Sequence, residues 1–382
     1  MDFLNHIIAV GDLLLRSFSV LFVVMIIIFV HEAGHYLIGR WCGIKASVFS
    51  LGFGPQIVCY TDKHGTQWRL ALIPLGGYVK FIGDEGEAGV ASSQSFPIVD
   101  GSFANAHAWK KAAVVFAGPL FNILFTVIIL TFFFFVYGRV AIEPVVGSLV
   151  KDSPAIQSGL ALGDRFVEMD GRPVESFEDL MNYVTFHGRN PIEFKMERMG
   201  RIFTTVITPK VIERDDGFGN RIQSGMIGVS VPVDPNNSAR LDSAYVKHIR
   251  YGFGGAVRKA SERATFIVTQ TILFMSRLIR GKEDYCRLSG PSKTIKIAWK
   301  VSETGFISLL NFAAFLSISI GLINLFPIPP LDGGHLFFHV IEALTRRPIS
   351  AKIQEIIFRL GFFIVFLFII FAFFNDYFCW FS

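Results

Sequence analysis

The stretch that decides the fold reads SFSVLFVVMIIIFV over residues 17–30 and continues directly into HEAGH over residues 31–35. The first part carries no charge and lies inside an apolar segment, residues 13–38, long enough to cross a hydrocarbon core about 30 Å thick. The second part adds three ionisable side chains at one end of that segment. Ionisable groups are costly in a membrane span, about 2.5–3.5 kcal/mol for each Asp, Lys or Arg. We therefore expect these three residues to serve one shared purpose.

The composition indicates a membrane protein with room for a soluble part. Of the 382 residues, 52% are hydrophobic and 18% are charged, whereas soluble domains average about 25% charged residues. The chain carries 41 Phe, glycine follows no period, and the four Cys show no metal-ligand spacing. These features exclude a disordered chain, a collagen-like repeat and a disulfide scaffold. The net charge of +5 is not gathered in a basic run, so we expect no nucleic-acid partner.

Three further segments are long and apolar enough to span a membrane, at residues 112–136, 306–325 and 356–374. A shorter stretch, residues 264–275, contains several polar residues and has arginines on both sides, so we predict an amphipathic surface helix there. The predicted fold class is therefore a polytopic α-helical membrane protein with about four transmembrane helices.

The distribution of basic residues in the short loops predicts the orientation. Lys and Arg gather between the first two spans, in residues 39–111, and between the last two spans. Such loops face the cytoplasm, whereas long domains cross largely regardless of their charge. We expect an inner-membrane protein of a bacterial cell, with both termini and the long segment 138–303 on the periplasmic side.

Residues 142–212 have the pattern of a soluble α+β domain. Short alternating strands and glycine-containing turns surround a predicted helix near residues 177–184. The order resembles a PDZ domain of the bacterial, protease-associated type, which implies a peptide or chain end bound along an exposed strand edge. A folded spacer without a ligand is the alternative. We predict a loop-rich linker over residues 213–250, with no second PDZ copy.

The HEAGH motif predicts a zinc centre. His31 and His35 are four residues apart, so both imidazoles lie on one face of a helix and can bind one Zn²⁺. Glu32 lies beside them and can act as general base for a water on the metal. The alternative is a helix end where these side chains merely reach the interface, but that arrangement would not require this spacing.

A catalytic zinc usually has three protein ligands, so a third ligand should come from another segment. The best candidate is Asp332, in the stretch NLFPIPPLDGGH that ends at His335. The three prolines break the third span at its inner end, and irregular backbone at this depth is tolerated where protein or a water-filled cavity surrounds it. His335 and His339 form a second pair with the same spacing and could compete as ligands, although no Glu follows the first of them.

Together, HEAGH in a first span, a PDZ-like insert and NLFPIPPLDGGH near the last spans resemble the site-2 protease family of intramembrane zinc metalloproteases. The resemblance implies a membrane-associated, β-rich segment over residues 42–111 and cleavage within or beside a substrate's transmembrane helix. It also implies single-span substrates already shortened outside the membrane, such as a truncated anti-sigma factor or remnant signal peptides. This activity is regulated intramembrane proteolysis.

The resemblance also suggests four substrate-binding residues. Gly76 and Gly77, in IPLGGYVK, resemble the strand-rich segment that offers an edge to an extended substrate. Asn122, at the end of FAGPLFN, resembles a second-span element, and Asn324 resembles an asparagine that handles substrate. Ordinary tight turns and helix-packing amides are the alternatives. The sequence that follows Leu288-Ser289-Gly290-Pro291 departs from the family pattern, which leaves gating and regulation open.

Two other functional classes are compatible with these motifs. A membrane zinc-handling protein would need polar residues spread through its spans, whereas here they cluster at one depth. An inactive PDZ scaffold would be indicated by loss of the motif glutamate, which is present as Glu32. The predicted parts, in chain order, are a first span with HExxH (residues 1–41), a β-rich segment (42–111), a second span (112–137), a PDZ-like domain (142–212), a linker with amphipathic helices (213–303), and the last two spans with the LDG motif (304–382).

Overall fold

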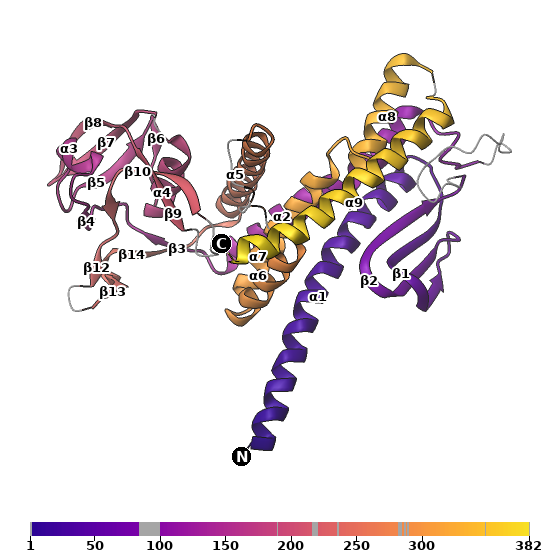
Figure 1. Cartoon of the computed structure of the whole chain (residues 1–382), viewed down its shortest axis with the longest axis horizontal. Helices are drawn as coiled ribbons and strands as arrows, with labels where there is room; N and C mark the ends of the chain where they lie inside the picture. The colour runs from indigo at the N-terminus through magenta and orange to yellow at the C-terminus, as the bar shows by residue number, and fades with distance from the viewer. Residues whose placement is uncertain are drawn as a thin grey trace. The chain divides into compact units, whose positions relative to one another are not determined.

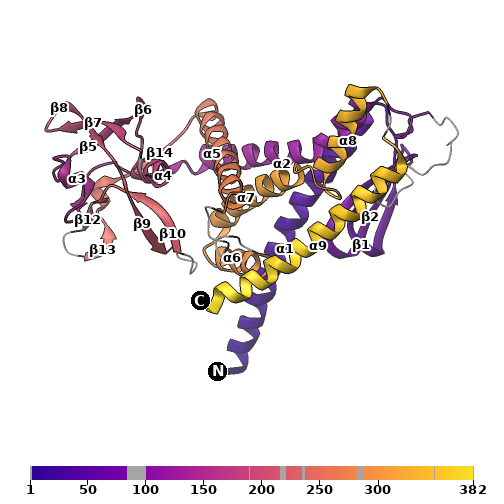
Figure 2. The ribbon, with the colours of Figure 1, turned by 45° about the horizontal axis from the view of Figure 1, so that its top comes forward.

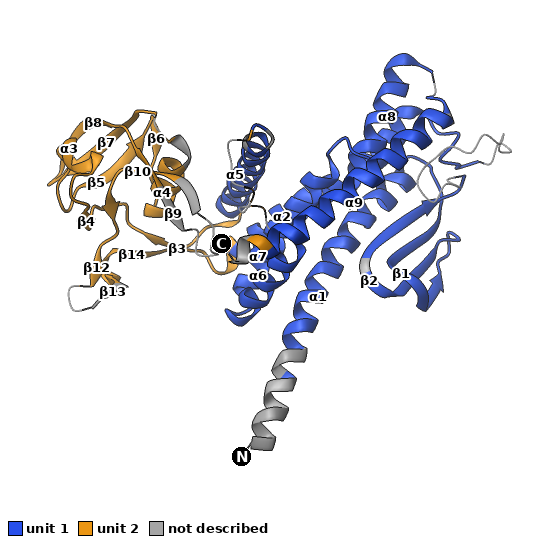
Figure 3. Cartoon of the chain, in the orientation of Figure 1, with its two compact units in different colours: residues 1–133, 254–280, 289–377 blue, residues 134–253, 281–288, 378–382 orange. Residues whose placement is uncertain are grey.

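The structure is a computed structural model. It describes residues 2–83, 100–188, 190–215, 221–234, 237–281, 285, 288, 290–347 and 349–381. The chain divides into two compact units (Figure 3). The first unit contains residues 1–133, 254–280 and 289–377, and the second contains residues 134–253, 281–288 and 378–382.

The first unit is built around four helices that are long and apolar enough to cross a membrane (Figure 1). They are α1 (Asp2–Trp41), α2 (Ala108–Val136), α7 (Phe306–Asn324) and α9 (Ala351–Phe381). Many of their large apolar side chains are exposed, as expected for helices that face lipid. The four helices coincide with the four segments predicted from the sequence.

A long antiparallel hairpin follows α1 and packs against its C-terminal end. Its strands are β1 (Ala46–Thr61) and β2 (Gln67–Phe81), and the pairing contains several irregularities. Asp62, in the turn, accepts hydrogen bonds from Tyr36 Oη of α1 at 3.2 Å and from Trp68 Nε1 at 3.1 Å. The hairpin is thereby bound to α1 at the residue that directly follows the HEAGH motif. The predicted β-rich segment over 42–111 contains this hairpin, and its residues 84–99 lie outside the described residues.

The proline-rich loop after α7 leads into α8 (Asp332–Thr345). Two glycines allow the loop to fold back over the first turn of this helix. A Cβ on Gly333 would lie 2.2 Å from the Phe326 carbonyl oxygen, and a Cβ on Gly334 would lie 2.6 Å from Pro329 N. The loop consequently fixes Asp332 at the beginning of α8.

The predicted amphipathic helix over residues 264–275 is the central part of a longer helix, α5 (Phe253–Ile279). Helix α5 is not one of the four candidate membrane spans found among the described residues, which agrees with its polar and basic content. Figure 2 shows α5 and α6 from a second direction.

Helix α6 (Pro291–Glu303) is held at both ends by residues of the spans. The Asp376 carboxylate of α9 accepts hydrogen bonds from Gly290 N at 2.8 Å and Lys293 N at 3.0 Å, and so caps its N-terminus. At the other end, Glu303 forms an ion pair with Arg16 of α1 at 2.8 Å. Gly290 belongs to the sequence Leu288-Ser289-Gly290-Pro291, of which Ser289 lies outside the described residues.

The second unit contains a four-stranded antiparallel sheet in the order β6-β5-β7-β8. The helix α4 (Phe177–His187) begins after Ser176, whose hydroxyl accepts a hydrogen bond from Asp179 N. Buried apolar residues of the sheet and of this helix form one core, which includes Phe166, Leu180 and Phe194. The strands are β5 (Arg165–Met169), β6 (Arg172–Pro173), β7 (Ile192–Arg198) and β8 (Arg201–Ile207).

The prediction of a loop-rich linker over residues 213–250 was wrong. Strand β14 (Val246–Ile249) pairs with β3 (Arg139–Ile142), and β11 (Val229–Ser230) pairs with β4 (Ser148–Leu149). Ile227 belongs to the buried core of the unit. Such short strands have no recognisable hydrophobic period and are stabilised by partners distant in sequence. Their local sequence pattern therefore resembles that of a loop. The other pairs are β9 (Lys210–Asp215) with β10 (Arg221–Met226) and β12 (Val233–Asp234) with β13 (Asn237–Leu241), and the short helices are α3 (Pro154–Gln157) and η1 (Ser243–Tyr245).

Candidate metal centre

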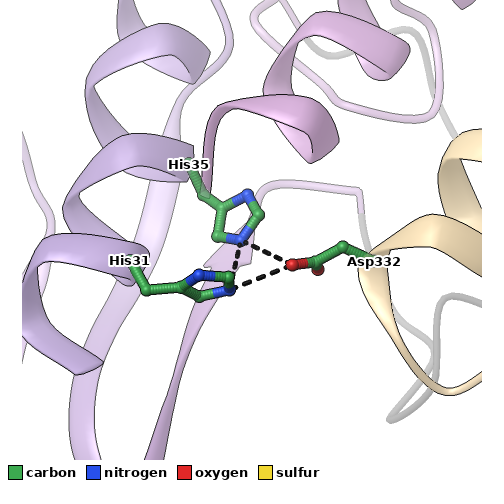
Figure 4. A group of neighbouring side chains, drawn as sticks. All are labelled: His31, His35 and Asp332. Carbon is green, nitrogen blue, oxygen red and sulfur yellow. Dashed lines mark hydrogen bonds and ion pairs between the residues drawn. The ribbon is translucent and has the colours of Figure 1, made fainter. Parts of the chain in front are cut away.

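The two histidines of α1 and the aspartate of α8 point toward one another (Figure 4). The Nε2 atoms of His31 and His35 are 3.3 Å apart. Asp332 Oδ2 lies 3.0 Å from the first of these atoms and 3.5 Å from the second. All three side chains are largely buried. The one-turn spacing in α1 and the loop that begins α8 therefore bring together residues about 300 positions apart in the chain.

This arrangement fits a bound metal ion. One ligand atom from each of these three residues lies within 4.8 Å of the others. Asp332 Oδ2 is buried, and its polar neighbours are the two imidazole nitrogens, with no further hydrogen-bond partner among the described residues. A buried carboxylate oxygen in that position needs a cation or a donor. Two imidazole nitrogens and one carboxylate oxygen form a donor set that suits Zn²⁺ and leaves a fourth position open.

The His35 ring is oriented by a backbone group. Its Nδ1 lies 2.8 Å from the Val114 carbonyl oxygen of α2. A protonated Nδ1 donates to that carbonyl and leaves the Nε2 lone pair facing the centre. Gly118, one turn further along α2, makes room for the rings, because a Cβ there would lie 2.2 Å from His35 Nε2. Sequence reasoning did not identify Gly118, although a glycine beside a proline in an apolar span is a recognisable sign of close packing.

The candidate base Glu32 is buried beside the histidines, with 8% of its surface exposed. The backbone of β2 passes directly over it at Gly77. A Cβ on Gly77 would lie 3.0 Å from Glu32 Cγ and 2.8 Å from the Ser50 carbonyl oxygen. Gly76 adopts a φ of 109°, where a side chain would be strained, and a Cβ there would meet the Phe53 ring. Both glycines thus permit close packing of the hairpin near the centre, and their contact with substrate stays a prediction.

The two predicted asparagines both lie against His31. Asn324 Nδ2 is 3.4 Å from its Nε2, on the side of the metal ligands. Asn122 Nδ2 is 3.3 Å from its Nδ1, on the opposite side of the ring. Asn122 has no exposed surface, and its contact with substrate stays a prediction.

The competing histidine pair of α8 lies elsewhere. The His335 ring packs against the Phe358 ring, with centroids 4.7 Å apart. His339 Nδ1 lies 3.6 Å from a carboxylate oxygen of Glu342 on the same helix. Neither histidine belongs to the converging group. The geometry therefore favours Asp332 as the third ligand.

Comparison with known proteins identifies the family. The family model described as peptidase family M50 matches residues 19–368. A Bartonella henselae protein named "Putative zinc metalloprotease BH06270" is 81% identical over 358 residues, covering 94% of this chain and all of that protein. Metalloprotease MmpA of Caulobacter vibrioides is 31% identical over 391 residues, covering 95% of each chain.

Among solved structures, the PDZ domain of an SdrC-like protein from Listeria monocytogenes matches 24% of this chain and 85% of its own, at 19% identity and a TM-score of 0.19. That score is too low to establish a shared fold. The family match and the relatives together extend over nearly the whole sequence, including both metal-site motifs. The chain belongs to peptidase family M50, the site-2 protease family, and is a membrane zinc metalloprotease.

Proposed function

We propose that the protein is an intramembrane endopeptidase that binds Zn²⁺ through His31, His35 and Asp332 and cleaves the transmembrane segments of single-span substrates. The observation that supports this most directly is the convergence of three ligand atoms within 4.8 Å at the end of a candidate span, with Glu32 buried beside them. Such an arrangement suits hydrolysis of a peptide bond.

Zinc, when bound, supplies the Lewis acid that polarises the scissile carbonyl and acidifies a water molecule. Glu32 accepts the proton of that water and delivers it to the leaving amide nitrogen. The Val114 carbonyl keeps the His35 ring in the tautomer that presents Nε2. The amide of Asn324 lies on the ligand side of His31, which supports the proposal that it contacts the substrate backbone near the reacting carbonyl.

A transmembrane helix must unwind before its peptide bonds become accessible. The β1–β2 hairpin, fixed next to the centre through Asp62 and Tyr36, offers a strand edge that can hold an unwound segment extended. We propose that Gly76 and Gly77 keep this edge close to the centre. The second unit, as a PDZ-like domain, would bind a newly exposed chain end or exclude bulky substrates.

We further propose an inner-membrane location in a bacterial cell, with the termini and the second unit in the periplasm and the metal centre toward the cytoplasm. The basic loops flanking the centre support this orientation. Single-span proteins already truncated outside the membrane, of the anti-sigma-factor type, and remnant signal peptides are the proposed substrates in regulated intramembrane proteolysis.

The test is cleavage of a single-span substrate with a short outer tail, in proteoliposomes, with zinc content measured on each protein. Glu32→Gln should keep zinc and lose cleavage by at least about 100-fold, the lower range for general acid–base catalysis. Asp332→Ala should lose both zinc and cleavage. His339→Gln is the matched control, because His339 lies on the same helix but outside the ligand group.

Cleavage by Glu32→Gln at the wild-type rate would contradict the proposed base. Zinc bound to the wild-type protein at full occupancy without cleavage of this substrate, or of one that keeps its outer domain, would favour a metal-handling role. Full zinc binding by Asp332→Ala would overturn the ligand set.

A further inference from the structure

We propose that Asn122 is a positioning residue for the metal ligand His31: its buried amide holds Nδ1 of the ring and so aims Nε2 into the centre. This inference deepens the proposed function, because it rests on His31 being a zinc ligand. It gives a role to a residue that the sequence suggested for substrate contact and that the structure buries completely.

The two nitrogens of His31 face different surroundings. Nε2 points to His35 and Asp332, at 3.3 and 3.0 Å. Nδ1 points away from them, toward the side chain of Asn122 at 3.3 Å. When one imidazole nitrogen binds a metal, the hydrogen bond made by the other nitrogen fixes the tautomer and the ring orientation. The Val114 carbonyl is the hydrogen-bond partner of Nδ1 in His35, and Asn122 is the corresponding partner in reach of Nδ1 in His31.

The chemistry of the amide suits this task. A neutral His31 that binds metal through Nε2 carries its proton on Nδ1 and needs an acceptor there. Asn122 Oδ1 is buried and has no hydrogen-bond partner. Rotation of the amide by half a turn exchanges its oxygen and nitrogen at nearly the same positions. The oxygen of Asn122 is then the acceptor that the Nδ1 proton requires.

Packing fixes the backbone that carries this amide. The Asn122 carbonyl oxygen accepts hydrogen bonds from Thr126 Oγ1 at 3.0 Å and from Ser317 Oγ of α7 at 2.9 Å. Gly321 of α7 brings the two helices close, since a Cβ there would lie 3.2 Å from Asn122 Cβ and 3.0 Å from the Pro119 carbonyl oxygen. Close packing of α2 and α7 therefore restrains the side chain that faces His31.

Asn324 provides the contrast. Its Nδ2 lies 3.4 Å from Nε2, so Asn324 is on the metal-binding side of the ring and does not support the ring from behind. Two asparagines against one ring should thus behave differently: loss of Asn122 weakens metal binding, whereas loss of Asn324 affects turnover.

The experiment measures the zinc dissociation constant of the full-length protein in detergent by competition with a chelator, and the absorption spectrum of the Co²⁺-substituted protein. Asn122→Leu should raise the zinc Kd about 10–100-fold, the usual effect of removing a group that orients a ligand, and should alter the Co²⁺ spectrum. Asn122→Asp should restore both, because a carboxylate oxygen accepts the Nδ1 proton. Asn311→Leu is the matched control, because the Asn311 amide donates to the Ile307 carbonyl of its own helix, and it should leave the zinc Kd unchanged.

An unchanged zinc Kd and Co²⁺ spectrum in Asn122→Leu would overturn the positioning role, as would failure of Asn122→Asp to restore them. If Asn122→Leu does not fold, Asn122→Ser, which is smaller and cannot reach Nδ1, is used instead and should show the same loss. Failure of the wild-type protein to bind zinc at all would refute the proposed centre itself, so the two failures are distinguishable.

Discussion

Replacement of Gly118 by alanine should empty the metal centre while leaving the fold intact. The new Cβ would lie 2.2 Å from His35 Nε2 and 2.9 Å from His31 Cε1, whereas ordinary contacts begin at 3.4 Å. The His35 ring must therefore move by about 1.2 Å, or α2 must move away from it. The His35 ring cannot rotate freely, because its Nδ1 is hydrogen-bonded to the carbonyl of Val114, which lies on α2 together with Gly118.

A displacement of this size is large compared with the tolerance of a metal site, in which ligand distances hold within about 0.2 Å. We expect the zinc Kd to rise by at least about 100-fold, the upper range for losing an orienting group, since here the ligand atom itself is displaced. The cost to folding should be smaller, about 1–3 kcal/mol for overpacking. Zinc competition measures the first quantity and thermal unfolding in detergent measures the second.

Gly254→Ala is the matched control, because a Cβ on this glycine of α5 meets no atom within 4 Å. It should leave zinc binding unchanged and leave the protein equally or slightly more stable. If Gly118→Ala bound zinc as tightly as Gly254→Ala, the inference that this glycine leaves space for the ligand rings would be refuted.

Three further changes test other parts of the fold. The side-chain hydrogen bond from Trp68 and backbone N–H donors lower the pKa of Asp62 to about 2. Asp62→Ala should therefore loosen the hairpin and change Trp68 fluorescence, and Asp62→Asn should do so less. Equal fluorescence spectra of the wild-type protein and both variants would contradict this. Although burial opposes the effect, hydrogen bonds from Arg198 lower the pKa of Asp164, so its contribution to the stability of the second unit is present above pH 3.8 and is lost as the pH falls through the depressed pKa. Pepsin should accordingly cut the wild-type second unit faster at pH 2 than at pH 4, and cut Asp164→Ala rapidly at both, whereas identical rates in the two proteins at pH 4 would contradict the role of the pair. Gly290→Ala should speed hydrogen exchange in α6, because its Cβ would lie 2.5 Å from a carbonyl oxygen of α9, and Gly252→Ala, which meets no atom within 4 Å, should not.

The sequence was most informative where one helix carries the chemistry. The spacing of His31 and His35 defines a common face, and an apolar run of this length allows few alternatives to a spanning helix. Asp332 could be selected because it follows a helix-breaking proline run on the same predicted side of the membrane. The structure confirms that the four spans form helices, and it brings these three residues together.

What the sequence could not supply are contacts between elements. The approach of Gly118 to the imidazoles depends on how α1 and α2 pack, and the two sides of His31 are occupied by asparagines from different helices. The strand pairing of residues 246–249 with residues 139–142 likewise depends on distant partners. Local propensity carries no information about such partners, which is why residues 213–250 have the local pattern of a linker.

The separation of the ligands along the chain has a consequence for biosynthesis. The histidine pair is complete early in the sequence, but the aspartate that joins it in space follows about 300 residues later. At a synthesis rate of about 5–20 residues per second, the first span waits roughly 15–60 s for its third ligand. A nascent chain therefore carries the two histidines without the aspartate through most of its translation. The group of three can form only after the α8 segment has been synthesised and has packed against α1.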